Sequence, residues 1–170
     1  MSPNKNRLYV ALYPSGVSND EERKFHWAFL IGPKAEKKKA VAGARYHVKN
    51  STGDWAFDEQ GIDNVLNTNT LLARLLIAKI EDEQRLIALF RRLPVVQGDP
   101  NWRCRTWVAS ALDEIAKDGK CVGTAELDWG KIEAWGRQYV KDKTTAGRYE
   151  KNLLEPRPTW DMLENKETIA

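Results

Sequence analysis

The chain has 170 residues, of which 42% are hydrophobic and 30% charged, and this length and balance favour one globular domain over a disordered chain. The net charge of +3 is too small to indicate nucleic acid as a partner, and no uninterrupted apolar run approaches the roughly 18 residues of a membrane span. The first ten residues are polar where a secretory signal is apolar, so we expect a cytoplasmic protein whose two cysteines are free thiols.

Four strands are predicted in the first 60 residues. Segment 7–16 alternates, is rich in aromatic and β-branched residues, and ends in a Pro-Ser-Gly turn. Segment 24–33 is strongly apolar and closes with Gly-Pro, and 44–50 and 54–60 flank a Ser-Thr-Gly turn. Consecutive strands with turn-rich links indicate an antiparallel meander.

The next segments are predicted to be largely helical. Segment 71–80 suits either a buried strand or a helix by periodicity alone. Segment 82–94 has acids at its start, basic residues near its end and a terminal proline, which is typical of a helix.

Two further helices complete the expected fold. Segment 101–119 has an apolar stripe, a cap at Asp99 or Asn101, and a glycine at its end. Segment 127–143 is also amphipathic, whereas the tail 144–170 is expected to be extended or partly disordered. We therefore predict a single α+β domain over 1–170, with an antiparallel sheet of about four to five strands packed against helices.

Cys104 lies in the first turn of its predicted helix, between Arg103 and Arg105. Unpaired N–H groups and the helix dipole stabilise a thiolate there, so we expect a reactive thiol at mildly acidic pH. The same N–H groups suit a developing oxyanion. The alternative for Cys104 is a half-buried structural cysteine, which is how we interpret Cys121.

His26 is the natural base for such a thiol. It sits in an apolar strand, where a histidine is costly unless it has a partner. His47, on the following strand, is expected to orient the His26 imidazole, and Asn50 is the second choice for that role. The alternative is that both histidines are structural.

The substrate-binding residues proposed from the sequence are Gln97, Trp27, Trp102 and Asn50. Gln97 precedes Cys104 in a loop, from which its amide could donate a second hydrogen bond to an oxyanion. Tryptophan side chains suit cleft walls, so a competing hypothesis is a binding module without turnover, whose walls are Trp27, Trp55, Trp102 and Trp107. The histidines and cysteines lack the clustered spacing of a zinc site, so we expect neither a metal nor a cofactor.

Read in order, these residues resemble a known group. A strand "HWAFLIGPK", a strand "YHVKN" and a helix beginning "WRCRTWVASAL" are similar to the permuted papain-like proteins, which include NlpC-type peptidases and lecithin–retinol acyltransferase-like enzymes. More narrowly, "RLYVALYPSG", "HWAFLIGPK", "RYHVKN" and "CRTWV" resemble a family of small uncharacterised fungal proteins. The resemblance covers roughly residues 7–118.

The resemblance implies a circularly permuted papain-like fold with Cys104 as nucleophile, His26 as base and His47 as orienting group. It favours a strand for 71–80. The cysteine follows Asn-Trp-Arg rather than the Asn-Cys-Glu-His context of the acyltransferase branch, which argues against acyl transfer between lipids. We expect a thiol enzyme that hydrolyses, transfers or cyclises a small-molecule or peptide substrate, with the oligomeric state left open.

Overall fold

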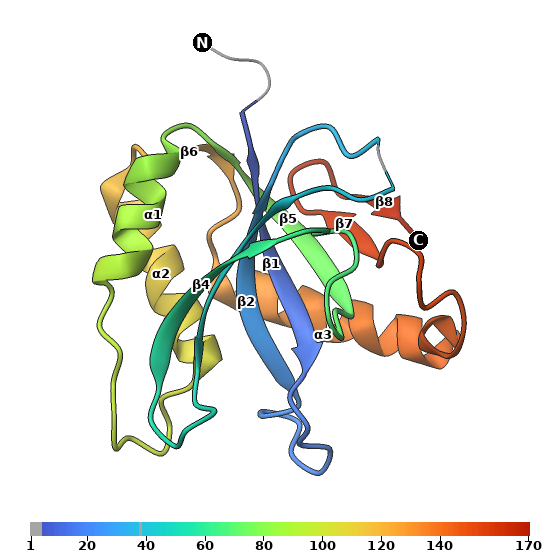
Figure 1. The fold of residues 1–170 in the computed structure, drawn as a ribbon, viewed down its shortest axis with the longest axis horizontal. Coiled ribbons are helices and arrows are strands. Elements are labelled where there is room, and N and C mark those ends of the chain that lie inside the picture. The colour runs from blue at the N-terminus through green and yellow to red at the C-terminus, as the bar shows by residue number, and fades with distance from the viewer. Residues whose placement is uncertain (1–4, 38) are drawn as a thin grey trace.

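One mixed sheet carries the fold, and three helices pack on one of its faces (Figure 1). The computed structural model describes residues 5–37 and 39–170. The strands are β1 (Arg7–Pro14), β2 (Phe25–Gly32), β3 (Gly43–Lys49), β4 (Ala56–Ile62), β5 (Ala73–Ile80), β6 (Val122–Ala125), β7 (Thr159–Asp161) and β8 (Lys166–Ile169). Their order in the sheet is β4-β3-β2-β1-β5-β7-β8, with β6 also pairing with β5, and every pair is antiparallel except β5 with β7.

The helices follow the middle of the chain. They are α1 (Glu83–Arg92), α2 (Cys104–Asp118), α3 (Trp129–Thr145) and the short 3-10 helix η1 (Arg148–Glu150). Among the described residues, none of them combines the length and apolar character that crossing a membrane requires. Helix α2 lies over β2 and β3, and α3 lies over β5.

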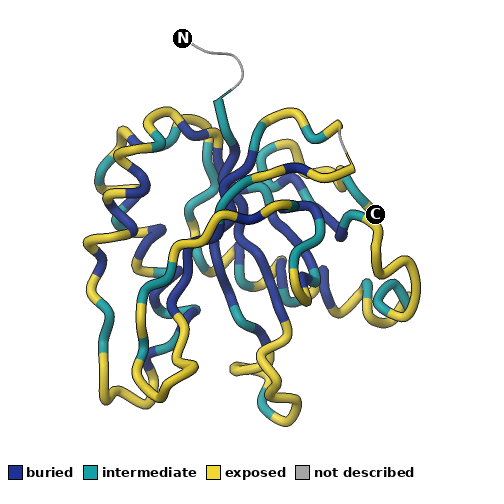
Figure 2. Tube along the Cα trace, viewed as in Figure 1, coloured by how far each residue is buried: buried dark blue, intermediate teal, exposed yellow. Residues whose placement is uncertain are grey.

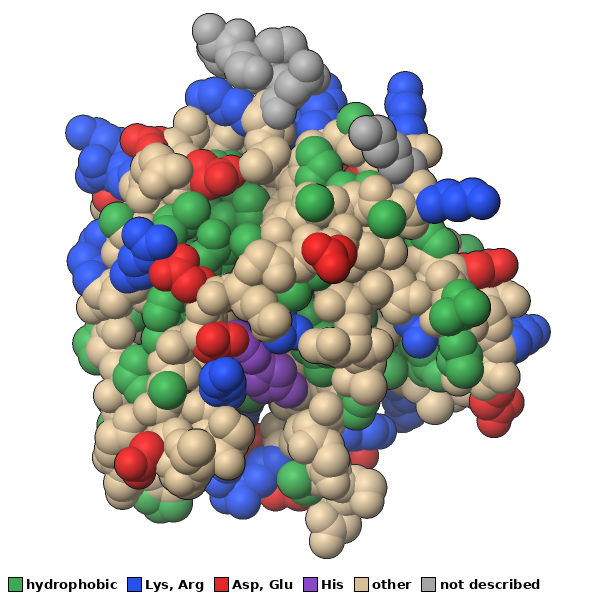
Figure 3. All heavy atoms as spheres, viewed as in Figure 1, with side chains coloured by type: hydrophobic (Ala, Val, Ile, Leu, Met, Phe, Trp, Pro, Cys, Tyr) green, Lys and Arg blue, Asp and Glu red, His purple; other side chains and the backbone are tan. Residues whose placement is uncertain are grey.

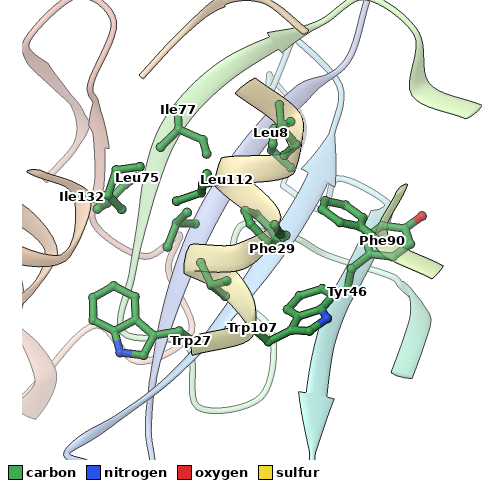
Figure 4. Close-up of a cluster of buried hydrophobic side chains, with 14 of the residues drawn as sticks. Leu8, Trp27, Phe29, Tyr46, Leu75, Ile77, Phe90, Trp107, Leu112 and Ile132 are labelled. Atoms are coloured by element: carbon green, nitrogen blue, oxygen red, sulfur yellow. The ribbon is translucent and has the colours of Figure 1, made fainter. Parts of the chain in front are cut away.

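The main core lies between the helices and the sheet. Because successive strand residues point to opposite faces, Leu8, Val10 and Leu12 of β1 all face the helices. Figure 4 shows aromatic side chains of the sheet and helices meeting there. Phe29 stacks on Phe90 with 4.9 Å between the ring centroids, and Trp107 lies edge-on to Phe29 with 5.8 Å between the centroids. This packing fixes where α2, and therefore its first residue, sits on the sheet.

The other face of the sheet is covered by loops. Tyr9, Ala11 and Tyr13 of β1 pack there with Ala28 and Leu30 of β2, under four buried residues from the connecting segments, Val41, Val65, Leu66 and Leu71. Figure 2 accordingly shows buried central strands and exposed connecting loops. Because both faces are covered, the central strands are apolar on both sides.

The predicted α+β class is confirmed, but within the described residues the sheet has eight strands rather than four or five. Segment 71–80 contains strand β5, in spite of its leucines and alanines. The tail 144–170 contributes η1, β7 and β8. Strand β7 has only three residues and pairs in parallel with β5, far away in the sequence, so local periodicity gives no signal for it.

A close approach at Gly43 joins β3 to the loop-covered face. A Cβ atom on Gly43 would lie 2.3 Å from the Ile31 carbonyl oxygen and 2.6 Å from Val65 Cγ1. Gly61, on the neighbouring strand β4, would place a Cβ with nothing within 4 Å. Only the first of these two strand glycines is required by packing.

We predict that Gly43→Ala lowers the free energy of unfolding by about 2–3 kcal/mol, because the added methyl pushes β3 away from the Ile31 carbonyl of β2 and from the Val65 side chain. Gly61→Ala, the matched control, should be neutral or stabilising by up to about 1 kcal/mol, since strand glycines cost entropy. Urea denaturation of both variants measures the difference, and equal midpoints would show that the Gly43 contact is not limiting.

Candidate functional site

A cavity of about 500 Å³ lies at the end of the sheet where β2 begins and α2 starts. Cys104, His26 and His47 all line it, together with Asn50 and Trp55. In Figure 3 the histidine side chains lie beside acidic and basic side chains and border a hollow on this face of the molecule. The fold therefore brings the three proposed catalytic residues to one cavity.

The cavity lies where β2 and β3 no longer pair. Within the described residues, the ladder between them joins only Phe29–Ile31 to Ala44–Tyr46. Beyond Phe29, the backbone N–H of Trp27 approaches the Cys104 sulfur and lowers the pKa of the thiol. The first residue of α2 thus lies beside β2 at the place where the two strands have separated.

The thiol and the imidazoles approach the cavity from different sides. His26 shares its face of β2 with Ala28 and Leu30, whereas α2 packs on the opposite face. Among the described residues, no hydrogen bond joins the Cys104 sulfur to an imidazole. His26 and Cys104 line one cavity, but the direct thiol–imidazole contact expected of a base and its nucleophile is not present in the described residues.

His26, His47 and Asp58 form a hydrogen-bonded chain across three strands. His26 Nε2 lies 2.7 Å from His47 Nδ1, and His47 Nε2 lies 3.1 Å from Asp58 Oδ2. The β3–β4 register places His47 directly opposite Asp58, so the second contact follows from strand pairing. The chain ends at an acceptor, the Asp58 carboxylate.

This end point fixes the tautomers. Burial raises the pKa of Asp58, but the hydrogen bond from His47 and the charge of Lys49 outweigh it, so the net pKa is lowered and Asp58 is ionised. An ionised carboxylate accepts, so His47 carries its proton on Nε2 and its Nδ1 accepts from His26 Nε2–H. His26 Nδ1 is then left as an unprotonated acceptor.

Burial keeps the imidazoles neutral. It lowers the pKa of His26 to about 4, and the nearby His47 and Arg45 act in the same direction. It also lowers the pKa of His47, although the hydrogen bond to Asp58 opposes this. At neutral pH both rings are uncharged, which is the state in which His26 Nδ1 can accept a proton.

The expectation of a Cys104 thiolate at mildly acidic pH is wrong. Burial raises the pKa of Cys104, and this outweighs the N–H groups of Trp27, Arg105 and Cys104 itself and the charge of Arg103, which lower it. The sequence argument counted the helix terminus but not the desolvation of a side chain that is 7% exposed. The resting site holds a neutral thiol.

Of the binding residues proposed from the sequence, one lines the cavity and the others do not. Asn50 lines the cavity. Trp27 is fully buried in the main core, edge-on to Trp129, and Trp102 is buried against Trp55, so neither is a wall of the cavity. Of the tryptophans proposed as walls, Trp55 alone lines this cavity within the described residues.

Gln97 has a different task from the one predicted. Its Oε1 accepts from the Trp55 N–H at 2.9 Å and its Nε2 donates to the Trp55 carbonyl at 2.6 Å. Both ends of the amide are used, and Gln97 does not line the cavity. Gln97 is therefore not an oxyanion donor; it joins the loop before α2 to the backbone of Trp55.

Helix α2 begins later than predicted. Arg103 is its N-cap, and Arg103 N–H donates to Thr106 Oγ1 at 3.1 Å, while Asp99 Oδ1 accepts from Asn101 N–H in the preceding turn. Cys104 is therefore the first helical residue, where backbone N–H groups have no partner within the helix.

Three further residues belong to the site and were missed from the sequence. Asp58 ends the hydrogen-bonded chain, and Tyr13 and Arg45 line the cavity beside the histidines. Pairing 44–50 with 54–60 directly across their turn would have placed Phe57 opposite His47, one residue away from the observed partner Asp58. No local pattern marks Tyr13 or Arg45. The described residues contain no cluster of three or more His, Cys, Asp or Glu side chains able to hold a metal ion.

The fold and cavity define a class of structure: an α+β domain with a buried cysteine and a His–His–Asp chain at one cavity. A family model, described as a family of unknown function (DUF6914), matches residues 5–169. The chain belongs to this family. Searches of the curated proteins and of the solved structures found no match.

The lowered pKa of His26 predicts acid sensitivity. Between pH 6.5 and 4 the unfolded chain binds a proton at His26 that the folded chain does not, so stability rises with pH across this window. Lowering the pH from 7 to 4 should therefore reduce the free energy of unfolding by about 3 kcal/mol through His26. Urea denaturation of wild type and His26→Gln across this range should show the two profiles converging at low pH, and parallel profiles would contradict the assignment.

Proposed function

We propose that the protein is a cysteine-dependent enzyme that hydrolyses, transfers or cyclises an acyl or amide compound, with Cys104 as nucleophile and His26 as base. One observation carries the proposal. The chain from Asp58 through His47 leaves Nδ1 of His26 unprotonated, and His26 and Cys104 line the same cavity. A nucleophile, a base and a group that orients the base are the parts that covalent catalysis requires.

The steps follow from these roles. In this proposal the proton of the Cys104 thiol passes to His26 Nδ1 across the cavity that both residues line, as the sulfur attacks the carbonyl carbon and a carbon–sulfur bond forms. The leaving amine or alcohol takes that proton from His26, its bond to the acyl carbon breaks, and a thioester remains. Water, an amine or an alcohol then attacks the thioester, loses its proton to His26, and the proton returns to the sulfur.

The start of α2 supplies the donors for the oxyanion. The backbone N–H groups of Cys104 and Arg105 already approach the sulfur, and at a helix start they have no carbonyl partner within the helix. Fixed donors of this kind stabilise the charge that develops on the substrate oxygen without reorganising. In our proposal they replace the side-chain donor expected at Gln97.

The arrangement also supports the proposed relationship to the permuted papain-like group. A histidine strand, a second polar strand and a cysteine at a helix start occur in that order along this chain. We place the activity in the cytoplasm, where Cys104 and Cys121, both free in the structure, stay reduced.

Acylation tests the nucleophile. With p-nitrophenyl acetate as a small acyl donor, we expect one acetyl group on the Cys104 peptide by mass spectrometry, and at least about tenfold slower acylation in His26→Ala. Cys121 is the internal control, because burial and its hydrogen bond to Asp118 raise its pKa to about 12. Acetylation of both cysteines at similar rates, unchanged by His26→Ala, would leave a binding module as the better account.

Asp58→Asn tests the chain as a positioning device. The side-chain amide introduced by this substitution can donate to His47 Nε2, which moves the His47 proton to Nδ1 and forces the His26 proton onto its own Nδ1. We expect acylation of Cys104 to slow by at least about tenfold. The His26 Nδ1 nitrogen should change from an acceptor-type to a protonated ¹⁵N chemical shift.

Asp54→Asn is the matched control, since Asp54 is exposed on the same β3–β4 hairpin. It should change neither the acylation rate nor the nitrogen shift. If Asp58→Asn slows acylation while His26 Nδ1 keeps its acceptor shift, the tautomer argument fails and Asp58 acts only on structure.

A further inference from the structure

The cavity that contains Cys104 carries an excess of positive charge. Its lining includes five cationic side chains and one carboxylate, Glu22; the cations are Arg23, Arg45, Lys49, Arg103 and Arg105. Glu22 is paired with Arg105. Arg23 and Lys49 pair with acids outside the lining, at 3.6 Å in each case. Within residues 5–37 and 39–170, Arg45 and Arg103 have no carboxylate partner.

Arg45 is the more unusual of these two, because it is buried. It is 8% exposed, and one of its terminal nitrogens donates to Gln60 Oε1 at 2.8 Å. Its Nε has no hydrogen-bond partner. Burying a guanidinium without a counter-charge is costly unless something supplies the missing acceptor.

Tyr13 lies beside Arg45 and also has a buried polar atom without a hydrogen-bond partner in the described residues. Tyr13 is 4% exposed, its Oη has no hydrogen-bond partner in the described residues, and the Arg45 guanidinium lies 5.7 Å from its ring centroid. Burial raises the pKa of Tyr13, although Arg45 lowers it by approaching the phenol as a hydrogen-bonding group and by its charge, so the phenol stays protonated and can donate. Two neighbouring residues that line one cavity therefore each carry a buried donor without an acceptor in the described residues.

We propose that Tyr13 and Arg45 form an anion subsite of this cavity and that the substrate carries a carboxylate which binds there. The carboxylate would accept from the Tyr13 hydroxyl and from the Arg45 guanidinium, whose Nε lacks a partner in the described residues, next to the His26 and His47 rings. This inference rests on the proposed function for the identity of the reacting group, since it describes the part of the acyl or amide substrate that does not react.

The charge count favours a carboxylate over a phosphate. The subsite offers one guanidinium and one neutral hydroxyl, which match a single negative charge. A phosphate dianion would leave a second charge without a buried partner. A planar carboxylate also suits the fork of donors on a guanidinium.

Binding to the Cys104→Ala protein tests the subsite without chemistry. The probes are N-acetylglycine, its uncharged analogue N-acetylglycinamide, and inorganic phosphate. The chain has two histidines, both at the cavity, so their imidazole Cε1–H signals report occupancy in a ¹³C-resolved NMR titration. We expect N-acetylglycine to bind at least about tenfold more tightly than the amide, as a hydrogen-bonded charge implies.

The variants assign that preference to residues. Arg45→Gln should abolish the preference for the acid, and Tyr13→Phe, which removes a single oxygen, should reduce it about three- to tenfold even if Arg45→Gln fails to fold. Arg23→Gln is the matched control, because it removes an exposed cation at the same cavity, and the preference should persist.

Equal binding of the acid and the amide, or a preference that survives both Arg45→Gln and Tyr13→Phe, would overturn the subsite. Tighter binding of phosphate, lost in Arg45→Gln, would overturn the assignment to a carboxylate. Because this protein lacks the thiol, these outcomes are independent of whether Cys104 is a nucleophile. If Cys104 is not acylated but the anion titration succeeds, the proposed enzyme activity is wrong and the proposed anion subsite stands.

Discussion

The approach of the Trp27 backbone N–H to the Cys104 sulfur joins the start of α2 to strand β2. A strand N–H needs an acceptor, and here β3 has already separated from β2, so the first residue of α2 lies where an acceptor is needed. The Trp27 side chain points the other way, into the core under α2 and α3. Trp27 therefore contacts the start of α2 through its backbone and the core through its side chain. The side chain of the neighbouring His26 lies on the opposite face of β2.

The neighbours of His26 along its own strand are apolar on that face, which is why the histidines need a chain of partners. Ala28 and Leu30 follow His26 on the loop-covered side of β2, and an unpaired imidazole among them would be costly. The Asp58 carboxylate resolves this by accepting at the exposed end of the chain. The same contacts that make the histidines tolerable in the core decide which nitrogen of His26 carries its proton, so stability and proposed reactivity have one origin.

The sequence predicts the elements better than it predicts their contacts. The first four strands follow from alternation, and the helix around 101–119 from its apolar stripe, because both are local signals. The strand β5 is buried on both faces, so its apolar run suits a helix equally well. Placing both His26 and Trp27 at one cavity was a local error, since adjacent strand residues point to opposite faces. Arg45 and Tyr13 meet only because β1, β2 and β3 are neighbours in the sheet, which no local pattern encodes.

The unpaired charge of Arg45 connects the substrate to the base. Burial and this charge hold the pKa of both imidazoles down, and burial holds the pKa of Cys104 up. Both shifts disfavour a thiolate–imidazolium pair. A carboxylate beside Arg45 cancels its charge and raises the proton affinity of His26, which is the change that a base needs before it can take the thiol proton. In our proposal the substrate therefore completes the electrostatics of the site, and the nucleophile is activated when the cavity is filled.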